Sequence, residues 1–369
     1  MLRVLSNVPI WQRLQWIKQT GMLYVQFPVA EHSRYDHSVG TAHLASEYGR
    51  KLDFPNDMHR VFVLAAALHD IGHGPMSHTF ERCTPFHHDA KRHELMRTDE
   101  HLRSALGPDT CAEICNVWNG GPSPWHRVAN TLIAGVAGVD RMQYLPQDRR
   151  YLGVHEVAVP SVRPAHIHAI MDGTSVNWET GLVTYTPEAC VNIEHVLRVR
   201  RCMFHNYYFN RYTVAADMCL RAAFDLGASK YLPSPDTHFA VLTDACVLAL
   251  ASATFVPPPI RYWISRAQGI QYAVEHEYMS AEGERDAYDQ LEPYVPAEVC
   301  LPCNTSFDSL RPPDLARGTL YASARVATPG VCAAEVNPAV VLRSDGKPIT
   351  TGWTAIPDVD KIVIMKLYH

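Results

Sequence analysis

Apolar and polar residues alternate through most of this chain at the three- and four-residue spacing of amphipathic helices. The strongest signal is an unbroken apolar run, Val61–Leu68, which is too short to span a membrane and suits a buried helix with Asp57 as its N-cap. The pattern predicts helices over residues 11–17, 37–52, 57–68, 94–106, 109–118, 124–134 and 187–226, and further helices over residues 232–293 with breaks at Pro257–Pro259.

The periodicity changes between Val162 and Tyr185. Ser175–Trp178 and Leu182–Tyr185 flank a short segment with Gly181 and predict a β-hairpin. From Tyr294 onward the chain is rich in proline, and its pattern predicts strands. The sequence therefore predicts a mainly α protein, with a helical core over residues 1–230 and a smaller helical and α+β C-terminal lobe over residues 231–369.

Composition narrows the class of protein. The 369 residues are 47% hydrophobic and 19% charged, which predicts a folded, soluble chain, and a net charge of -5 argues against a general nucleic-acid binder. The ten cysteines show no disulfide framework, so we expect a reducing intracellular compartment, the cytoplasm or the nucleus. Cys300 and Cys303 form a CxxC, but no second pair has zinc-finger spacing. We expect neither a signal peptide nor contact with a membrane.

The apolar run ends directly in His69 and Asp70, and His73 and His78 follow within a segment that contains Gly72. An imidazole and a carboxylate at the end of a buried helix are costly unless a charged group such as a metal ion offsets their burial. A polar helix end at the surface is the plain alternative. A zinc-protease pattern is excluded, because it needs a glutamate after the first histidine and an unbroken helix.

The motif HDIGHGPMSH, with RYDHS before it and VDRMQY after it, resembles the HD-domain metal phosphohydrolases. Within them the chain is most similar to the dNTP triphosphohydrolases, and above all to the catalytic core of the animal enzymes that combine a sterile alpha motif with an HD domain. The resemblance implies an HD-domain helical bundle. The similar stretches occur in family order at Pro9–Pro28, Ser33–Ala45, Arg92–Leu95, Val139–Asp148 and Arg200–Arg211.

The resemblance implies one metal site whose ligands come from three helices. The ion would be Fe, Mn, Zn or Mg, because histidine and aspartate suit these metals. A second Mg ion that bridges the phosphates of the substrate is a further implication. The implied ligands are His37, His69, Asp70 and Asp140.

The same resemblance places His73 and His78 on the phosphate side of the metal, with His93 nearby. His78 would act as general acid toward the leaving 5′-oxygen, because the proton of a histidine is available near neutral pH. Glu81 receives no role and is expected to be a solvated helix residue.

Substrate contacts follow from the resemblance as well. Gln19 and Asp148 would contact the sugar 3′-hydroxyl, and Tyr208 would pack against C2′ and exclude a 2′-hydroxyl. The residues implied for triphosphate binding are Arg34, Arg141, Tyr144 and Arg200.

These features predict an enzyme that hydrolyses dNTP to deoxynucleoside and triphosphate and that forms a homo-oligomer, a dimer or a tetramer. One alternative is another HD-domain nucleotidase or phosphodiesterase, although a monophosphate does not need so many cations. The other alternative is a non-catalytic relative that binds nucleotides or single-stranded nucleic acid.

Overall fold

The computed structural model describes residues 2–155, 158–208 and 210–269, together with the strand segments 273–278, 300–302, 321–328, 341–343 and 359–366. Helices dominate the first two thirds of the chain. They are α1 (Pro9–Arg13), α2 (Arg34–Lys51), α3 (Asn56–Leu68), α4 (His78–Cys83), α5 (His88–Thr98), α6 (Glu100–Leu106), α7 (Pro108–Trp118), α8 (Pro124–Ala134), α9 (Val139–Tyr151), α10 (Pro164–Asp172), α11 (Pro187–Met203), α12 (Arg211–Asp225), α13 (Asp244–Ala249) and α14 (Pro258–Gln268).

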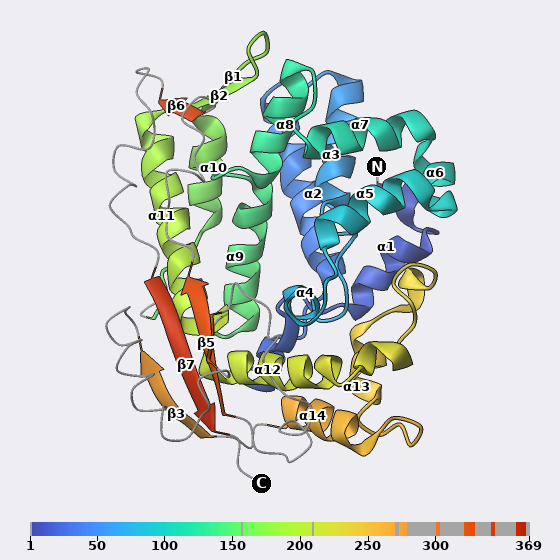
Figure 1. Ribbon diagram of the computed structural model, residues 1–369. Helices are drawn as coiled ribbons and strands as arrows, with labels where there is room; N and C mark the ends of the chain where they lie inside the picture. The colour runs from blue at the N-terminus through green and yellow to red at the C-terminus, as the bar shows by residue number, and fades with distance from the viewer. Residues whose placement is uncertain are drawn as a thin grey trace.

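The core lies around α3, which contacts α2 on one side and α7 on another, while α2 also packs against α9 (Figure 1). The residues Phe62–Leu68 are all buried, because α3 is apolar around its circumference and neighbouring helices cover every face. Below the bundle in this view, α12 runs across its end and contacts α4 and α14. The predicted mainly α architecture is confirmed.

The start of α2 is fixed by a capping box. The Ser33 hydroxyl accepts a hydrogen bond from the Asp36 backbone N–H at 3.2 Å, and the Ser33 N–H donates to Asp36 Oδ2 at 3.1 Å. The helix therefore begins at Arg34, three residues earlier than predicted. Arg34 and His37 consequently lie one turn apart on the same face of α2.

A glycine brings α2 and α9 unusually close. A Cβ atom on Gly40 would lie 2.3 Å from Nε2 of Gln143, a separation that no real side chain tolerates. The amide of Gln143 fills the space and reaches His37 on the other helix. The absence of a side chain at Gly40 therefore sets the spacing of two helices that carry predicted ligands.

Three helix boundaries differ from the predictions. The helix predicted over residues 187–226 is interrupted by one π-helical turn, η4 (Phe204–Tyr208), between α11 and α12. The helix predicted over residues 94–106 is two helices, because the Asp99 carboxylate caps α6 by accepting from Leu102 N–H at 2.8 Å. Asp57 lies in the first turn of α3 and is not its N-cap, which is Pro55.

The predicted hairpin is confirmed as β1 (Thr174–Asn177) and β2 (Leu182–Tyr185), paired antiparallel. β2 also pairs in parallel with β6 (Val341–Arg343) from the far end of the chain. A second sheet has the order β3-β7-β5-β4 and forms the strand part of the predicted α+β lobe. Its strands are β3 (Ala273–Tyr278), β4 (Cys300–Pro302), β5 (Tyr321–Thr328) and β7 (Val359–Lys366).

Two further predictions concern this part of the chain. The helical assignment of residues 232–293 is wrong at β3, where the alternating sequence AVEHEY pairs with β7. Cys303 of the CxxC lies outside the described residues. Among the helices that the structure describes, none combines the length and the apolar composition that crossing a lipid bilayer requires.

Candidate metal centre

Four side chains from three places in the helical bundle converge on one point. His37 comes from α2, His69 and Asp70 follow the last turn of α3, and Asp140 opens α9. The Nε2 atom of His37 lies 3.2 Å from Nε2 of His69, 3.2 Å from Asp140 Oδ1 and 3.3 Å from Asp70 Oδ2. The Nε2 atom of His69 lies 3.3 Å from Asp70 Oδ1 and 3.5 Å from Asp140 Oδ1.

These spacings fit the coordination shell of one small divalent ion. Ligands that bind at about 2.1 Å stand about 3.0 Å apart at right angles and about 3.4 Å apart in a tetrahedron. The distances between the two imidazoles, and from each imidazole to each carboxylate, fall at 3.2–3.5 Å. Such a mixed nitrogen and oxygen set suits Zn, Mn or Fe better than a metal that prefers thiolates. The arrangement is what the sequence predicted, while the role of each residue as a ligand and the identity of the metal stay predictions.

Both ligand histidines are held in the tautomer that metal binding needs. Nδ1 of His37 contacts the side-chain oxygen of Gln143, and Nδ1 of His69 lies 2.7 Å from the Ala66 carbonyl oxygen. Because these oxygens only accept hydrogen bonds, the proton of each ring stands on Nδ1. Nε2 of each ring is therefore the atom directed at the shared point, and in the metal-free protein Nε2 of His37 carries the proton that a metal would displace.

The electrostatics of the centre favour a cation. Burial alone would raise the pKa of Asp70, but the charge of Arg34 and the neighbouring histidines outweigh it and hold that pKa well below its usual range. Burial would raise the pKa of Asp140 as well, but hydrogen bonds with His37 and His69 outweigh it and hold that pKa below its usual value. Two carboxylates thus remain negative inside the bundle, where Arg34 and, without a metal, protonated His37 offset their charge.

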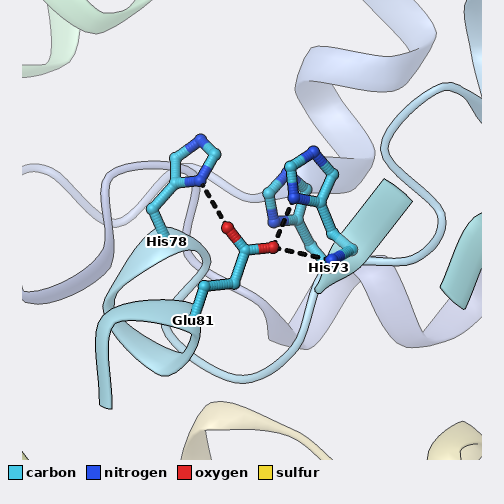
Figure 2. Close-up of side chains that lie close together, drawn as sticks. His73, His78 and Glu81 are labelled. Atoms are coloured by element: carbon cyan, nitrogen blue, oxygen red, sulfur yellow. Dashed lines mark hydrogen bonds and ion pairs between the residues drawn. The ribbon is translucent and has the colours of Figure 1, made fainter. Parts of the chain in front are cut away.

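A second cluster of histidines lies beside this centre, around the carboxylate of Glu81. Figure 2 shows that carboxylate between the rings of His78 and His73. Nδ1 of His78 lies 2.9 Å from Glu81 Oε2, while the backbone N–H of His88 donates to Oε1 at 2.8 Å and the His88 ring bonds the same oxygen. Nε2 of His73 lies 3.4 Å from Asp70 Oδ1, so the cluster adjoins the metal centre.

Hydrogen bonding keeps Glu81 ionised. Burial alone would raise the pKa of Glu81, but the hydrogen bonds from His78 and His88 outweigh it and lower that pKa below its usual value. A charged carboxylate must accept both bonds, so Nδ1 of His78 and Nδ1 of His88 each carry a proton. Nε2 of His88 lies 3.5 Å from Asp89 Oδ1, whereas Nε2 of His78 is not used by Glu81.

One expectation for this cluster is wrong. Glu81 is not a solvated helix residue, since two histidines bind it. His88, which was not predicted, stacks on the His73 ring with centroids 4.0 Å apart. The His93 ring lies against Trp118 with ring centroids 5.5 Å apart, and its place near the phosphates stays a prediction. The sequence feature that could have drawn attention to His88 is its position at the start of a helix, directly before the acidic residue Asp89.

Comparison with known proteins identifies the part of the chain that holds these residues. The family model described as HD domain matches residues 34–115, which include His37, His69 and Asp70 and the cluster around Glu81. The chain contains an HD domain. Asp140 lies C-terminal to the matched segment and completes the centre from α9.

Several relatives share the HD domain. The chain is 36% identical over 143 residues to an uncharacterized protein of Methanocaldococcus jannaschii, in a match that covers 39% of this chain and 29% of that protein. It is 33% identical over 165 residues to the deoxynucleoside triphosphate triphosphohydrolase SAMHD1 homolog of Dictyostelium discoideum, covering 39% and 32%. It is 27% identical over 221 residues to the uncharacterized protein YwfO of Bacillus subtilis, covering 57% and 48%. The chain thus spans less than half the length of each of these relatives.

Solved structures extend the likeness of fold beyond the HD domain. A hypothetical protein from Aquifex aeolicus superposes with a TM-score of 0.74 at 21% identity, covering 98% of this chain and 91% of that chain. A phosphohydrolase from Bacteroides thetaiotaomicron superposes with a TM-score of 0.72 at 20% identity, covering 99% and 95%. At this identity the two comparisons establish a common fold.

The predicted phosphate-binding cations lie on two sides of the HD-domain centre. Arg34 is buried, bonds Asp70 and donates from Nε to Ser77 Oγ at 2.7 Å. Arg141 lies beside Asp140 on α9, and its Nη1 is buried without a hydrogen-bond partner in the described part of the chain. Burial raises the pKa of Tyr144, and the nearby Arg200 and Arg141 oppose that rise. Arg141, Tyr144 and Arg200 therefore form one group, and their binding of phosphate stays a prediction.

The predicted sugar contacts meet in a buried hydrogen-bond network. The Tyr208 hydroxyl donates to Asp148 Oδ2 at 2.6 Å, and Nε2 of His32 lies 2.7 Å from Oδ1 of the same carboxylate. His32 was not predicted, and its ring stacks on Tyr151. Oε1 of Gln19 is buried without a hydrogen-bond partner among the described residues, which leaves an acceptor for a ligand hydroxyl.

The electrostatics of the centre give a prediction for metal affinity. Burial lowers the pKa of His37, but hydrogen bonds with Asp140 and Asp70 outweigh it and raise that pKa to about 10 in the metal-free protein. A metal must displace this proton, so its apparent affinity should rise with pH, by roughly tenfold per pH unit between pH 6 and 9. Titration calorimetry with Mn in buffers of different ionisation enthalpy should show about one proton released per bound ion. An affinity that does not change with pH would contradict this assignment.

Proposed function

We propose that this protein is a metal-dependent dNTP triphosphohydrolase, which converts dNTP and water to deoxynucleoside and triphosphate. The observation that carries the proposal is the junction of three groups at one place: the four-residue metal centre, the histidine cluster around Glu81, and the arginines on α2, α9 and α11. The named activity of the Dictyostelium relative supports the same assignment. A homo-oligomeric assembly is part of the proposal.

The histidine cluster is suited to proton transfer at a leaving oxygen. Burial lowers the pKa of His78, and the hydrogen bond with Glu81 opposes that lowering. Glu81 fixes the Nδ1 proton of His78, so that Nε2–H of the protonated ring can protonate the 5′-oxygen as the bond from that oxygen to the α-phosphorus breaks. A bound divalent metal would polarise the phosphoryl group and lower the pKa of its water. His73 is neutral, because burial and the charge of Arg34 hold its pKa well below the usual value, and it can accept a hydrogen bond beside the reacting group.

The arginines favour a polyphosphate over a monophosphate. Arg34 reaches the centre from α2, whereas Arg141 and Arg200 stand near Tyr144 on the other side. Guanidinium groups bind phosphate oxygens through paired N–H donors, and three of them suit a triphosphate of several negative charges.

The network around Asp148 provides the basis for sugar selection. Because Asp148 binds the Tyr208 hydroxyl, the tyrosine ring is fixed in position and cannot easily move aside for a 2′-hydroxyl. The second oxygen of Asp148 is bound by His32, so the carboxylate is held to accept a further bond from a 3′-hydroxyl. We expect deoxynucleotides to be preferred over ribonucleotides, because the Tyr208 ring leaves no room for a 2′-hydroxyl.

The reaction products test the proposal. Purified protein should be incubated with each dNTP and NTP and with Mn, Mg, Fe or Zn, and the products should be separated by chromatography. We expect deoxynucleoside and triphosphate, with heavy oxygen from labelled water in the triphosphate, because the water attacks the α-phosphorus. A dNMP with pyrophosphate would instead indicate a more general HD-domain pyrophosphatase. Tight binding of nucleotide or single strands without any product would favour a non-catalytic relative.

A further inference from the structure

The loop that joins α3 to α4 carries His73 and ends at His78, and its backbone adopts a conformation that side chains disfavour. Met76 and Ser77 both have φ of 55°, in the left-handed region, although neither is glycine. Such conformations persist only where the surrounding structure holds them. The loop must therefore be fixed by contacts beyond its own sequence.

One of these contacts is made by Asp244, a buried residue that lies far along the chain. Its Oδ1 accepts a hydrogen bond from the Met76 backbone N–H at 2.5 Å, and its Oδ2 accepts one from the Lys18 backbone N–H at 2.9 Å. Both oxygens of the carboxylate are thus used by backbone donors, one of them on a residue with positive φ. Asp244 ties the loop to the N-terminal segment through a single side chain.

A second contact is made by Arg13, which is also buried. Its Nη1 donates to the His73 carbonyl oxygen at 2.8 Å, and its Nε donates to the Leu242 carbonyl oxygen at 2.6 Å. The guanidinium lies 4.0 Å from the centroid of the Phe239 ring. The segment from Phe239 to Asp244 is therefore linked to the loop at two points. Arg13 connects it to His73, and Asp244 itself binds Met76.

We propose that Asp244 and Arg13 are positioning residues for the loop, and that they set the directions in which His73 and His78 face the metal centre. Neither residue supplies a predicted ligand, and both lie outside residues 34–115 of the HD domain. The kinetic part of this inference rests on the proposed hydrolysis of dNTP. The structural part concerns the loop alone.

The variant Asp244→Asn tests the inference with little change in volume. An amide has one accepting oxygen, so its NH₂ group would face either the Met76 or the Lys18 N–H, and one backbone hydrogen bond is lost. Arg13→Lys is a second, milder variant that keeps the charge but cannot donate to the His73 and Leu242 carbonyls from one planar group. The matched control is Tyr48→Phe, which removes a buried 2.6 Å hydrogen bond to Thr174 far from the loop.

The readouts are melting temperature, metal content, amide hydrogen exchange of residues 72–78, and kcat and KM for dNTP, all measured well below the melting temperature. We expect Asp244→Asn and Arg13→Lys to keep the metal and to change KM little. Exchange of the loop amides should accelerate and kcat should fall by about 10- to 100-fold, because small misplacements of reacting groups are costly. Tyr48→Phe should lower the melting temperature without changing the exchange of the loop or kcat.

Two results would overturn the inference. One is loop exchange in both variants as slow as in Tyr48→Phe. The other is a kcat no lower than that of Tyr48→Phe at the same distance from the melting temperature. If the wild-type protein hydrolyses no dNTP, the proposed function fails, but faster loop exchange in the variants alone still supports the positioning role.

Discussion

Replacing His69 or Asp70 with alanine is expected to remove the bound metal and the hydrolytic activity together. Each change deletes one of four donors, and the two histidine nitrogens lie 3.2–3.5 Å from each other and from both carboxylates. Loss of a group in the layer behind a metal ligand already costs about 10- to 100-fold in affinity, so loss of a ligand itself should cost at least about 100-fold. Elemental analysis of protein purified without chelator, with dNTP turnover measured on the same samples, checks both quantities.

The two variants differ in a way that separates metal loss from misfolding. His69→Ala leaves the buried pair of Arg34 and Asp70 intact, whereas Asp70→Ala also leaves the Arg34 guanidinium without its carboxylate. Removing one partner of a buried ion pair typically costs about 3–5 kcal/mol, so Asp70→Ala should melt at a lower temperature. Asp57→Ala, at an exposed position in the first turn of the same helix, serves as control. Full metal content in both ligand variants would rule out the ligand assignment.

The variant His78→Asn is expected to retain metal and substrate but to lose most turnover. His78 lies outside the four-residue centre, and its ring is oriented by Glu81, so its loss should affect the departure of the 5′-oxygen rather than the binding of metal. A general acid typically contributes about 10²- to 10⁴-fold to the rate. Single-turnover kinetics and equilibrium binding of dNTP measure the two effects separately.

The control is His101→Asn, the same substitution at an exposed histidine of α6. Glu81→Gln should give an intermediate loss of turnover, because the amide no longer holds the His78 proton on Nδ1 as a carboxylate does. If His78→Asn weakens substrate binding while bound substrate still turns over at nearly the normal rate, His78 is a binding residue and the acid lies elsewhere.

The convergence of the predicted ligands could be read from the sequence because each belongs to a short motif. His69 and Asp70 end the most apolar helix of the chain, and His37 and Asp140 lie near the starts of helices. The resemblance to HD-domain proteins, and not local pattern alone, implied that these residues share one site, and helix starts and ends can meet at one end of a bundle.

The histidines that bind Glu81 could not be predicted in this way. His88 and His93 lie five residues apart on α5 and so face different directions, and the sequence alone did not show which face meets the loop. A single glutamate after the motif is equally typical of a solvated helix. The environment of Glu81 depends on His88, which lies at the start of the next helix, α5.

Long-range packing explains the other differences. The π-helical turn before α12 depends on how Tyr208 reaches Asp148, a residue 60 positions earlier in the sequence. The boundary predicted at residue 230 stays a prediction, although Arg13 and Asp244 form hydrogen bonds across it. The preferred substrate, the assembly and the compartment also stay predictions.

The contact at Gly40 has a consequence for the choice of ion. Gly40 contributes no donor atom, yet the amide of Gln143 occupies the space where its side chain would be, which allows α9 to stand close enough for Asp140 to reach within 3.2 Å of His37. A larger residue would have to displace the Gln143 side chain from His37 or move α9 outward, and the second change would widen the gap between ligands on different helices. Small ions such as Mg and Zn bind at about 2.0–2.1 Å, whereas Ca needs about 2.3–2.6 Å, so a wider gap would favour the larger ionic radius. We therefore expect the close approach of α2 and α9 to contribute to a preference for small divalent ions.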